Sequence, residues 1–483
     1  MSEFSTIHLL HKALRQGRTT CTAVVQSYLN RIAAHQRLNA FREVYAEEAL
    51  AQAAALDARL RAGQPVGPLA GVVIGIKDVI CYAGHHVGAA SRILEGFLSP
   101  YSATAVERLL AADAILIGNL NCDEFAMGST NENSAYGPVR NALDETRVPG
   151  GSSGGSAVAV QADLCLLSLG SDTGGSVRQP ADFCGIIGLK PSYGRISRYG
   201  LIAYASSFDQ IGIFGKNIAD VAQVLQVIAG PDQYDSTASQ QEVPDYQADL
   251  EHNKSWKIAY LKDAIHHEGL DPEMKAGFLH FFEEMEQAGN TVEAVDFDCL
   301  DYVVPAYYVL TTAEASSNLS RFDGVKYGHR TPDANVTLSE FYKKSRSEGF
   351  GKEVKRRILL GTFVLSAGYF DAYFTKAQKV RRLVMDRVNA ILAGYDAIIL
   401  PTVPSTAFKL GEKMEDPIAM YLADIYTVLA NLVGTPAISV PLTVHSNGMP
   451  YGIQIITRKF DEANLLRLAH TINVTTNKQV TTS

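Results

Sequence analysis

The chain runs Pro149-Gly-Gly-Ser-Ser-Gly-Gly-Ser156 and then, after one intervening stretch, Gly170-Ser-Asp-Thr-Gly-Gly-Ser-Val-Arg-Gln-Pro180. The intervening residues 156–169 begin with a helix-like pattern and end in an apolar run. A flexible low-complexity linker would not contain such a core segment. The region is therefore predicted to form two structured loops that are joined by a buried element.

Short apolar stretches on both sides of these loops predict an α/β fold. Residues 71–76 form a β-branched run that ends at Lys77, which is typical of a buried strand. Further strands are expected at residues 114–117, 256–261, 397–401 and 436–441, with helices near 278–285 and 420–432. This alternation favours a central mixed β-sheet that is flanked by helices on both faces.

Changes in composition divide the chain into four regions. Residues 1–65 have helical spacing and high helix propensity, and residues 66–230 are predicted to form the core with Lys77 and both serine loops. A polar span opens residues 231–395, which we interpret as an insertion or subdomain. Residues 396–483 are expected to return to the core.

The composition excludes several functional classes. The chain has 43 basic and 51 acidic side chains and a net charge of −8, so it lacks the basic surface that nucleic-acid binding requires. Residues 1–10 do not resemble a signal peptide, and no apolar run is long enough to span a membrane. The 6 cysteines are scattered without a C-x-x-C pair, which predicts reduced thiols and a cytoplasmic location. No P-loop, H-E-x-x-H or other metal-binding spacing occurs, so we expect no metal site.

The first loop permits two interpretations. Gly150-Gly-Ser152-Ser-Gly154 fits the G-x-S-x-G pattern of a nucleophile elbow, which would need an acid and a histidine as partners. An elbow also needs a preceding strand, and Pro149 would remove a sheet hydrogen bond where that strand should end. The 12 histidines are dispersed and form no distinctive motif.

The second loop offers a different chemistry. Thr173-Gly-Gly-Ser176 provides consecutive backbone N–H groups that can surround a developing oxyanion, with a serine at the point of attack. A serine nucleophile needs a base, and burial lowers the preference of a lysine such as Lys77 for its charged form. Taken alone, the loop could be a plain glycine turn and Lys77 an ordinary strand-end lysine with its amine in solvent.

Three motifs together resemble the amidase signature family: Gly75-Ile-Lys-Asp78, the GGSSGGS run at 150–156 and the DTGGSVRQP run at 172–180. The resemblance implies the fold of that family and a catalytic triad of Lys77, Ser152 and Ser176. In the implied roles, Ser176 is the nucleophile, Ser152 follows a cis peptide and relays the proton, and Lys77 is the base. Thr173, Gly174, Gly175 and Ser176 would supply the oxyanion hole. Asp172 and Arg178 would support the nucleophile, unless they form only a structural ion pair.

Other segments are similar to the branch of this family that serves tRNA-dependent amidotransferases. They are residues 123–129, 321–327, 353–358 and 420–424. This resemblance implies a pocket for glutamine with Arg357 for the α-carboxylate, Asp424 for the α-ammonium and Tyr308 as a supporting hydroxyl, alongside Met127 and Ser129. Glu353 and Arg357 could instead pair on a helix surface, and Arg356 could take the place of Arg357.

The same resemblance implies how the protein would work with others. It would hydrolyse glutamine and deliver ammonia to a complex that converts Glu-tRNA(Gln) or Asp-tRNA(Asn). A kinase-like tRNA-binding subunit would supply ATP and Mg²⁺ chemistry and hold most of the tRNA, and a small third subunit would complete the complex. Two alternatives remain open: a free-standing amidase for small aliphatic or aryl amides, and a non-catalytic scaffold.

Overall fold

The computed structural model describes residues 4–252, 254–412 and 423–480. In this part of the chain one 11-stranded sheet runs through the molecule in the order β1-β3-β2-β4-β6-β5-β10-β11-β9-β7-β8. The strands are β1 (Phe41–Val44), β2 (Val73–Lys77), β3 (Ile115–Leu120), β4 (Leu167–Asp172), β5 (Ile187–Lys190), β6 (Gln210–Gly215), β7 (Lys257–Leu261), β8 (Thr291–Val295), β9 (Ala397–Pro401), β10 (Ala437–Val444) and β11 (Pro450–Ile456).

The sheet is mixed, as predicted. β2 is parallel to both β3 and β4, and β7 is parallel to both β8 and β9, whereas the pairs in the middle are antiparallel. Each of the four predicted regions contributes at least one strand to this sheet. The regional division itself stays a prediction.

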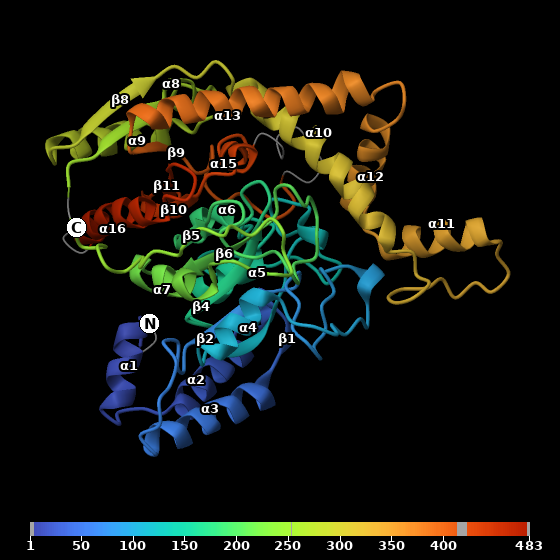
Figure 1. Cartoon of the computed structure of the whole chain (residues 1–483), viewed down its shortest axis with the longest axis horizontal. Helices are drawn as coiled ribbons and strands as arrows, with labels where there is room; N and C mark the ends of the chain where they lie inside the picture. The colour runs from blue at the N-terminus through green and yellow to red at the C-terminus, as the bar shows by residue number, and fades with distance from the viewer. Residues whose placement is uncertain (1–3, 253, 413–422, 481–483) are drawn as a thin grey trace.

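Helices surround the sheet (Figure 1). They are α1 (Ile7–Arg15), α2 (Cys21–Ala34), α3 (Ala46–Arg61), α4 (Thr104–Ala111), α5 (Gly154–Gln161), α6 (Arg178–Phe183), α7 (Ile218–Ile228), α8 (Lys262–Ile265), α9 (Pro272–Gln287), α10 (Leu300–Asn318), α11 (Leu338–Gly349), α12 (Lys352–Val364), α13 (Lys376–Gly394), α15 (Val428–Val433) and α16 (Glu462–Val480). Polar caps begin several of them: the Thr20 side chain accepts a hydrogen bond from Ala23 N–H at α2, and Asp271 caps α9 ahead of Pro272.

Two details differ from the prediction. The first region is not wholly helical, because β1 pairs antiparallel with β3 at the edge of the sheet. This strand has only four residues, too few to produce a period that stands out against the flanking helices. The helix expected over 420–432 begins later, at Val428, and residues 420–422 lie outside the described part of the chain.

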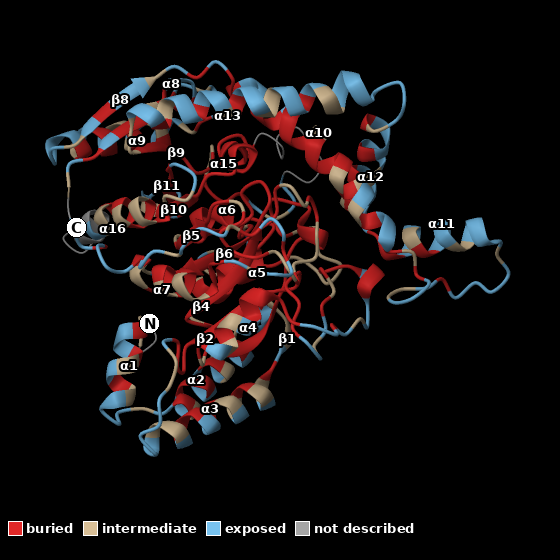
Figure 2. Ribbon diagram, in the orientation of Figure 1, coloured by how far each residue is buried: buried red, intermediate tan, exposed pale blue. Residues whose placement is uncertain are grey.

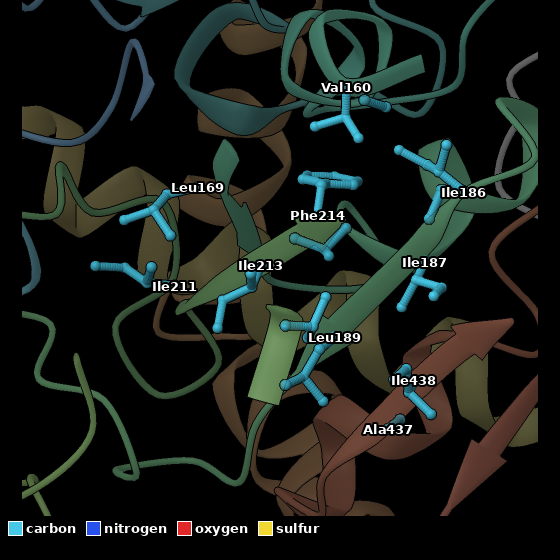
Figure 3. Packing of buried hydrophobic residues seen from close by; sticks show 14 of the residues in the cluster. Val160, Leu169, Ile186, Ile187, Leu189, Ile211, Ile213, Phe214, Ala437 and Ile438 are labelled. Atoms are coloured by element: carbon cyan, nitrogen blue, oxygen red, sulfur yellow. The ribbon is translucent and has the colours of Figure 1, made fainter. Parts of the chain in front are cut away.

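The two faces of the sheet are covered by different helices. In β6, Gly212 faces Val177 beside α6, whereas Gly215, an odd number of residues later, faces Val221 in α7. α5 contacts α6 and α16 contacts α7, so each face has its own pair of helices. Figure 3 shows apolar side chains of these strands, with Phe214 beside Val160 of α5.

A second layer of helices lies outside this core. α10 packs against α12, α13 and the buried α15, and α10 and α12 extend beyond the sheet (Figure 1). The outward sides of α11, α12 and α13 are exposed, in contrast to the buried central strands (Figure 2). Within the residues described, none of the helices combines the length and apolar character that crossing a membrane requires.

Candidate active site

Lys77 ends β2 in the interior of the molecule and is fully buried. Its Nζ donates hydrogen bonds to three serine hydroxyls: Ser152 Oγ at 2.7 Å, Ser153 Oγ at 2.9 Å and Ser171 Oγ at 2.8 Å. Burial lowers the pKa of Lys77 to about 8, against the opposing effect of nearby acidic groups such as Asp123 and Asp172. About a tenth of the amine is therefore neutral at pH 7, and the fraction grows as pH rises.

The first serine loop delivers Ser152 to this lysine. The peptide bond between Gly151 and Ser152 is cis, and both Ser152 and Ser153 are buried. The elbow interpretation fails here, because residues 141–151 contain an isolated bridge at Arg147 and no strand that leads into Ser152. Pro149 and the glycines that follow it instead form an irregular loop ahead of α5.

The second serine loop is held by the Asp172 carboxylate, which is fully buried. It accepts hydrogen bonds from the backbone N–H groups of Gly175 at 3.0 Å and Val177 at 3.1 Å, and it forms an ion pair with Arg178 at 2.9 Å. Burial opposes ionisation of Asp172, but the charge and hydrogen bonds of Arg178 outweigh it and lower the pKa to about 2. The loop is thus wrapped around a permanently charged carboxylate.

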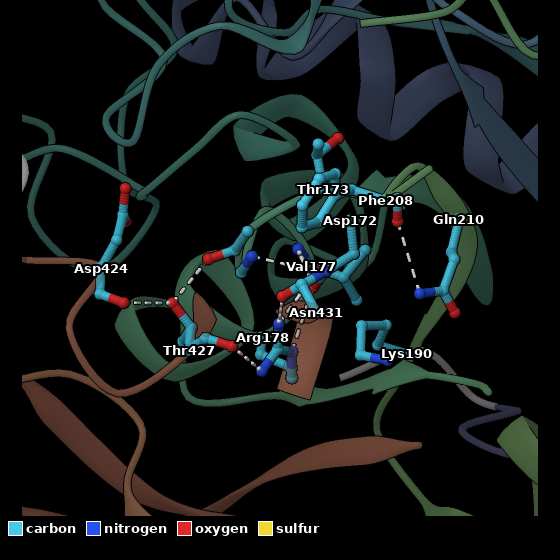
Figure 4. Close-up of polar contacts among 12 residues, drawn as sticks. Asp172, Thr173, Val177, Arg178, Lys190, Phe208, Gln210, Asp424, Thr427 and Asn431 are labelled. Carbon is cyan, nitrogen blue, oxygen red and sulfur yellow. Dashed lines mark hydrogen bonds and ion pairs between the residues drawn. The ribbon is translucent and has the colours of Figure 1, made fainter. Parts of the chain in front are cut away.

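Arg178 anchors the loop to the C-terminal part of the chain. Its guanidinium donates to Thr427 O at 2.7 Å and to Asn431 Oδ1 at 2.6 Å (Figure 4). It also donates to Gln454 Oε1. The Asp172–Arg178 pair is therefore a structural ion pair, and through its contacts it also shapes the loop that carries Ser176.

The backbone of this loop is closely packed against two side chains. A Cβ atom at Gly174 would lie 2.3 Å from the Tyr307 hydroxyl, and one at Gly175 would lie 2.3 Å from Thr427 Oγ1. Gly175 also has a φ of +128°, which disfavours any side chain. A side chain would therefore clash at either glycine, and at Gly175 it would also be disfavoured by the backbone conformation.

Not all of the predicted oxyanion donors are available in the folded loop. The N–H of Gly175 is committed to Asp172. For the N–H groups of Gly174 and Ser176, no acceptor lies within hydrogen-bond distance among the described residues. Thr173 is fixed by its hydroxyl, which donates to Asp209 Oδ1 at 2.7 Å.

Ser176 lies on this loop, 8% exposed, while Ser152 is completely enclosed. Its carbonyl accepts a hydrogen bond from Ser153 N–H at 3.2 Å, so the two serine loops touch. Across the described chain, no hydrogen bond joins the Ser176 hydroxyl to Ser152 or Lys77. Of the three predicted triad members, Lys77 and Ser152 are joined by a hydrogen bond, and Ser176 lies on the neighbouring loop.

Asp424, the predicted ligand of the α-ammonium group, forms hydrogen bonds with two other predicted pocket residues, Ser129 and Tyr308. Ser129 Oγ donates to its two carboxylate oxygens at 3.0 and 2.9 Å, and the Tyr308 hydroxyl donates at 3.1 Å. Burial raises the pKa of Asp424 to about 6, although Ser129, Arg357 and Tyr308 oppose the shift. Met127 is fully buried in the segment that leads to Ser129.

Arg356 and Arg357 lie on different faces of α12. Arg357 is 4% exposed, donates to the Tyr204 hydroxyl at 2.8 Å, and has its guanidinium 5.3 Å from the centre of the Tyr308 ring. The Arg356 side chain is 42% exposed and pairs with Glu353. Arg357 also makes the predicted helix pairing, since its Nε donates to Glu353 Oε1 at 2.7 Å.

Several residues at the candidate site were not predicted from the sequence. Ser153 and Ser171 accept the other two hydrogen bonds from Lys77 Nζ. Their position in the same two serine-containing segments could have identified them from the sequence. Asp209 and Asp123 are buried nearby, and burial raises the pKa of each to about 7. Asp123 begins the 123–129 segment noted above but was given no role there, and no pattern in the sequence distinguished Asp209 from an ordinary carboxylate. The described side chains form no cluster of three or more potential metal ligands.

Known proteins resemble this chain over nearly its whole length. The Amidase family model matches residues 23–466. Two A subunits of glutamyl-tRNA(Gln) amidotransferase are each 52% identical to it: that of Koribacter versatilis over 97% of both chains, and that of Chlorobium phaeobacteroides over 96% of this chain and 98% of its own. The crystal structure of the protein of the same name from Thermotoga maritima superimposes with a TM-score of 0.77 at 41% identity, covering 93% of this chain and 90% of that one.

Proposed function

The chain belongs to the amidase family, in the branch of the glutamyl-tRNA(Gln) amidotransferase A subunits, and from this premise we propose that it hydrolyses glutamine to supply ammonia for tRNA-dependent amidation. One observation carries the proposal. The buried Lys77 is hydrogen-bonded to Ser152 and lies beside the loop that carries Ser176. Thr427 links that loop to Asp424, and Asp424 and Arg357, which carry opposite charges, both contact Tyr308. Such a pair suits the head of an amino acid.

In the proposed mechanism Ser176 Oγ attacks the side-chain amide carbon of glutamine. Its proton passes to Ser152, and Ser152 gives its own proton to neutral Lys77, which the lowered pKa of about 8 makes accessible. The negative charge that forms on the carbonyl oxygen is stabilised by N–H groups of the Thr173–Ser176 loop, those of Gly174 and Ser176 foremost.

Collapse of this intermediate releases ammonia. The proton held by Lys77 returns through Ser152 to the leaving nitrogen, which departs as NH₃ and leaves an ester on Ser176. Water, activated by the same pair, then adds to the ester carbonyl, and glutamate leaves as Ser176 regains its proton. Ser153 and Ser171, which also accept hydrogen bonds from Lys77 Nζ, hold the amine in place for both transfers.

Recognition of glutamine follows from the two charges. Arg357 can bind both oxygens of the α-carboxylate, and Asp424 can accept hydrogen bonds from the α-ammonium. Tyr308 lies between them, since its ring contacts the Arg357 guanidinium and its hydroxyl donates to Asp424. Met127 and Ser129 form the adjoining wall of the proposed pocket.

The proposal places this chain in a complex. Ammonia would pass to a tRNA-binding, kinase-like subunit that uses ATP and Mg²⁺ to activate Glu-tRNA(Gln) or Asp-tRNA(Asn), and a small third subunit would complete the assembly. The net charge of −8 supports contact with tRNA mainly through the partner. The 6 buried free cysteines support a reducing, cytoplasmic setting.

The test is to tag the chain in its native host, purify what accompanies it in stoichiometric amounts, and assay the product. We expect two partners and glutamine- and ATP-dependent formation of Gln-tRNA(Gln) or Asn-tRNA(Asn). A solitary chain that hydrolyses small aliphatic or aryl amides but not glutamine would contradict the proposal and identify a free-standing amidase. Insensitivity of Ser176 to a serine-acylating reagent would favour the scaffold.

A further inference from the structure

Glu124 is a buried carboxylate that the proposed mechanism does not use. It begins the short helical turn η3 (Glu124–Ala126) and is 2% exposed. Both of its oxygens accept a hydrogen bond from Gly351 N–H, at 3.1 and 2.9 Å, and Oε1 also accepts from the Ser91 hydroxyl. The carboxylate therefore joins three segments that are far apart in the sequence.

The contact lies at the N-terminus of α12. Gly351 is the N-cap residue of this helix and has no side chain with which to cap it. The Glu124 carboxylate takes that role from outside the helix, where a negative charge is favoured by the unpaired N–H groups and the helix dipole. A Cβ atom at Gly351 would lie 2.3 Å from Glu124 Oε2, so glycine is needed there for space.

This end of α12 is packed on one side and open on the other. A cavity of about 430 Å³ borders Gly351, Lys352 and Lys355 as well as Glu124 itself. On the packed side Phe350 is buried against Phe125, so the hydrogen bonds from Ser91 and Gly351 to Glu124 act together with this packing to position the helix terminus. Burial raises the pKa of Glu124 to about 7, while Ser91 and Gly351 favour its ionised form.

Both residues of this contact, Glu124 and Gly351, are connected along the chain to the proposed head-group site formed by Arg357 and Asp424. α12 carries Arg357 less than two turns after Gly351, about 9 Å along the helix axis. The segment that starts at Glu124 continues through Met127 to Ser129, whose hydroxyl holds Asp424. One carboxylate thus ties the helix of the proposed carboxylate ligand to the loop that orients the proposed ammonium ligand.

We infer that Glu124 is a positioning residue for recognition of the glutamine head group, an inference that rests on the function proposed above. It fixes the N-terminus of α12 against the Glu124–Ser129 segment, and so sets the separation of Arg357 and Asp424. Its loss should weaken glutamine binding while leaving the Lys77–Ser152 pair and the Ser176 loop unchanged.

The first test is Glu124→Gln in the full chain with its co-purifying partners. The amide keeps the volume but replaces one acceptor oxygen with an NH₂ group that faces Gly351 N–H. We expect the KM for glutamine to rise about tenfold or more, with kcat within about threefold. Acylation of Ser176 by an uncharged serine-directed reagent should keep its wild-type rate. Glu132→Gln, in the wall of the same cavity, is the matched control and should change neither parameter.

A second variant breaks the contact from the helix side. Gly351→Ala places a methyl group against the Glu124 carboxylate and should raise KM in the same way, whereas Gly368→Ala, where a side chain meets nothing within 4 Å, should not. An active wild type with unchanged KM in both Glu124→Gln and Gly351→Ala would overturn the inference. Equal loss of glutamine hydrolysis and of uncharged acylation would also overturn it. A wild type without glutaminase activity would contradict the proposed function itself, and the inference with it.

Discussion

The serine–lysine centre and the head-group site lie side by side but are built differently. The centre comes from loops at the ends of β2 and β4, and its geometry is set by glycines, backbone N–H groups and a buried ion pair. The head-group site uses side chains of α10, α12 and Asp424, and α12 belongs to an outer layer with one face in solvent (Figure 2). The difference teaches that the proposed catalytic centre is held largely by main-chain contacts and a buried ion pair, whereas the proposed head-group site is held by contacts between buried side chains.

The largest effect is expected at the centre. Ser176→Ala should reduce glutamine hydrolysis by at least about 10³-fold, because the variant has no nucleophile at the point of attack. The ammonia-fed amidation of the complex should persist, since it does not need this chain's chemistry. Both rates are measurable on one preparation. Glutaminase activity that survives in Ser176→Ala would assign the nucleophile to another hydroxyl.

Lys77→Met should cost about 10² to 10⁴-fold in kcat, the usual contribution of a general base. In the wild type, burial gives Lys77 a pKa of about 8, so its neutral form increases as pH rises through that value. At saturating glutamine, kcat should therefore rise about tenfold between pH 7 and pH 9. A profile that is flat over this range would show that another group accepts the proton.

Variants of the head-group site should separate binding from chemistry. Arg357→Lys and Asp424→Asn should each raise KM for glutamine about 10- to 100-fold, because each removes a charge-assisted hydrogen bond. The rate of Ser176 acylation by an uncharged reagent should stay near that of the wild type. Arg356→Lys is the matched control, since that side chain is half exposed and pairs with Glu353. Equal effects at Arg356 and Arg357 would remove the distinction between the two helix faces.

The smallest effect is a pH dependence of binding. Burial raises the pKa of Asp424 to about 6, so the carboxylate becomes neutral as pH falls through that value and loses its attraction for an ammonium group. The affinity for glutamine should fall about twofold at pH 6 relative to pH 8. Titration of binding in Ser176→Ala measures this directly, and adding Asp424→Asn should abolish the dependence. Persistence of the pH effect in that double variant would point to a different group.

The same contrast explains which features could be predicted from the sequence alone. β2 is an uninterrupted apolar run that ends at Lys77, and both serine loops are marked by glycine, so their positions were readable from local pattern. The mixed sheet was likewise predicted from alternating elements and is confirmed. Arg357 and Arg356 could not be separated, because the distinction depends on which side of α12 faces Tyr308.

Other features were set by long-range contacts that leave little local trace. The helix expected over 420–432 begins only at Val428, and residues 423–427 form a turn in which the Asp424 carboxylate contacts Ser129 and Tyr308. The commitment of Gly175 N–H to Asp172 depends on the folded loop and not on its composition. The cap that Glu124 gives α12 joins residues that no periodicity connects.

The strand order has a consequence for the order of assembly during translation. β10 lies between β5 and β11, and Arg178 is anchored by Thr427, Asn431 and Gln454, so the loop that bears Ser176 takes its supports from the last part of the polypeptide. A ribosome must therefore make residue 454 of 483 before the loop can be completed. A nascent chain, or one truncated before residue 454, is consequently expected to lack the supports of this loop and to be inert.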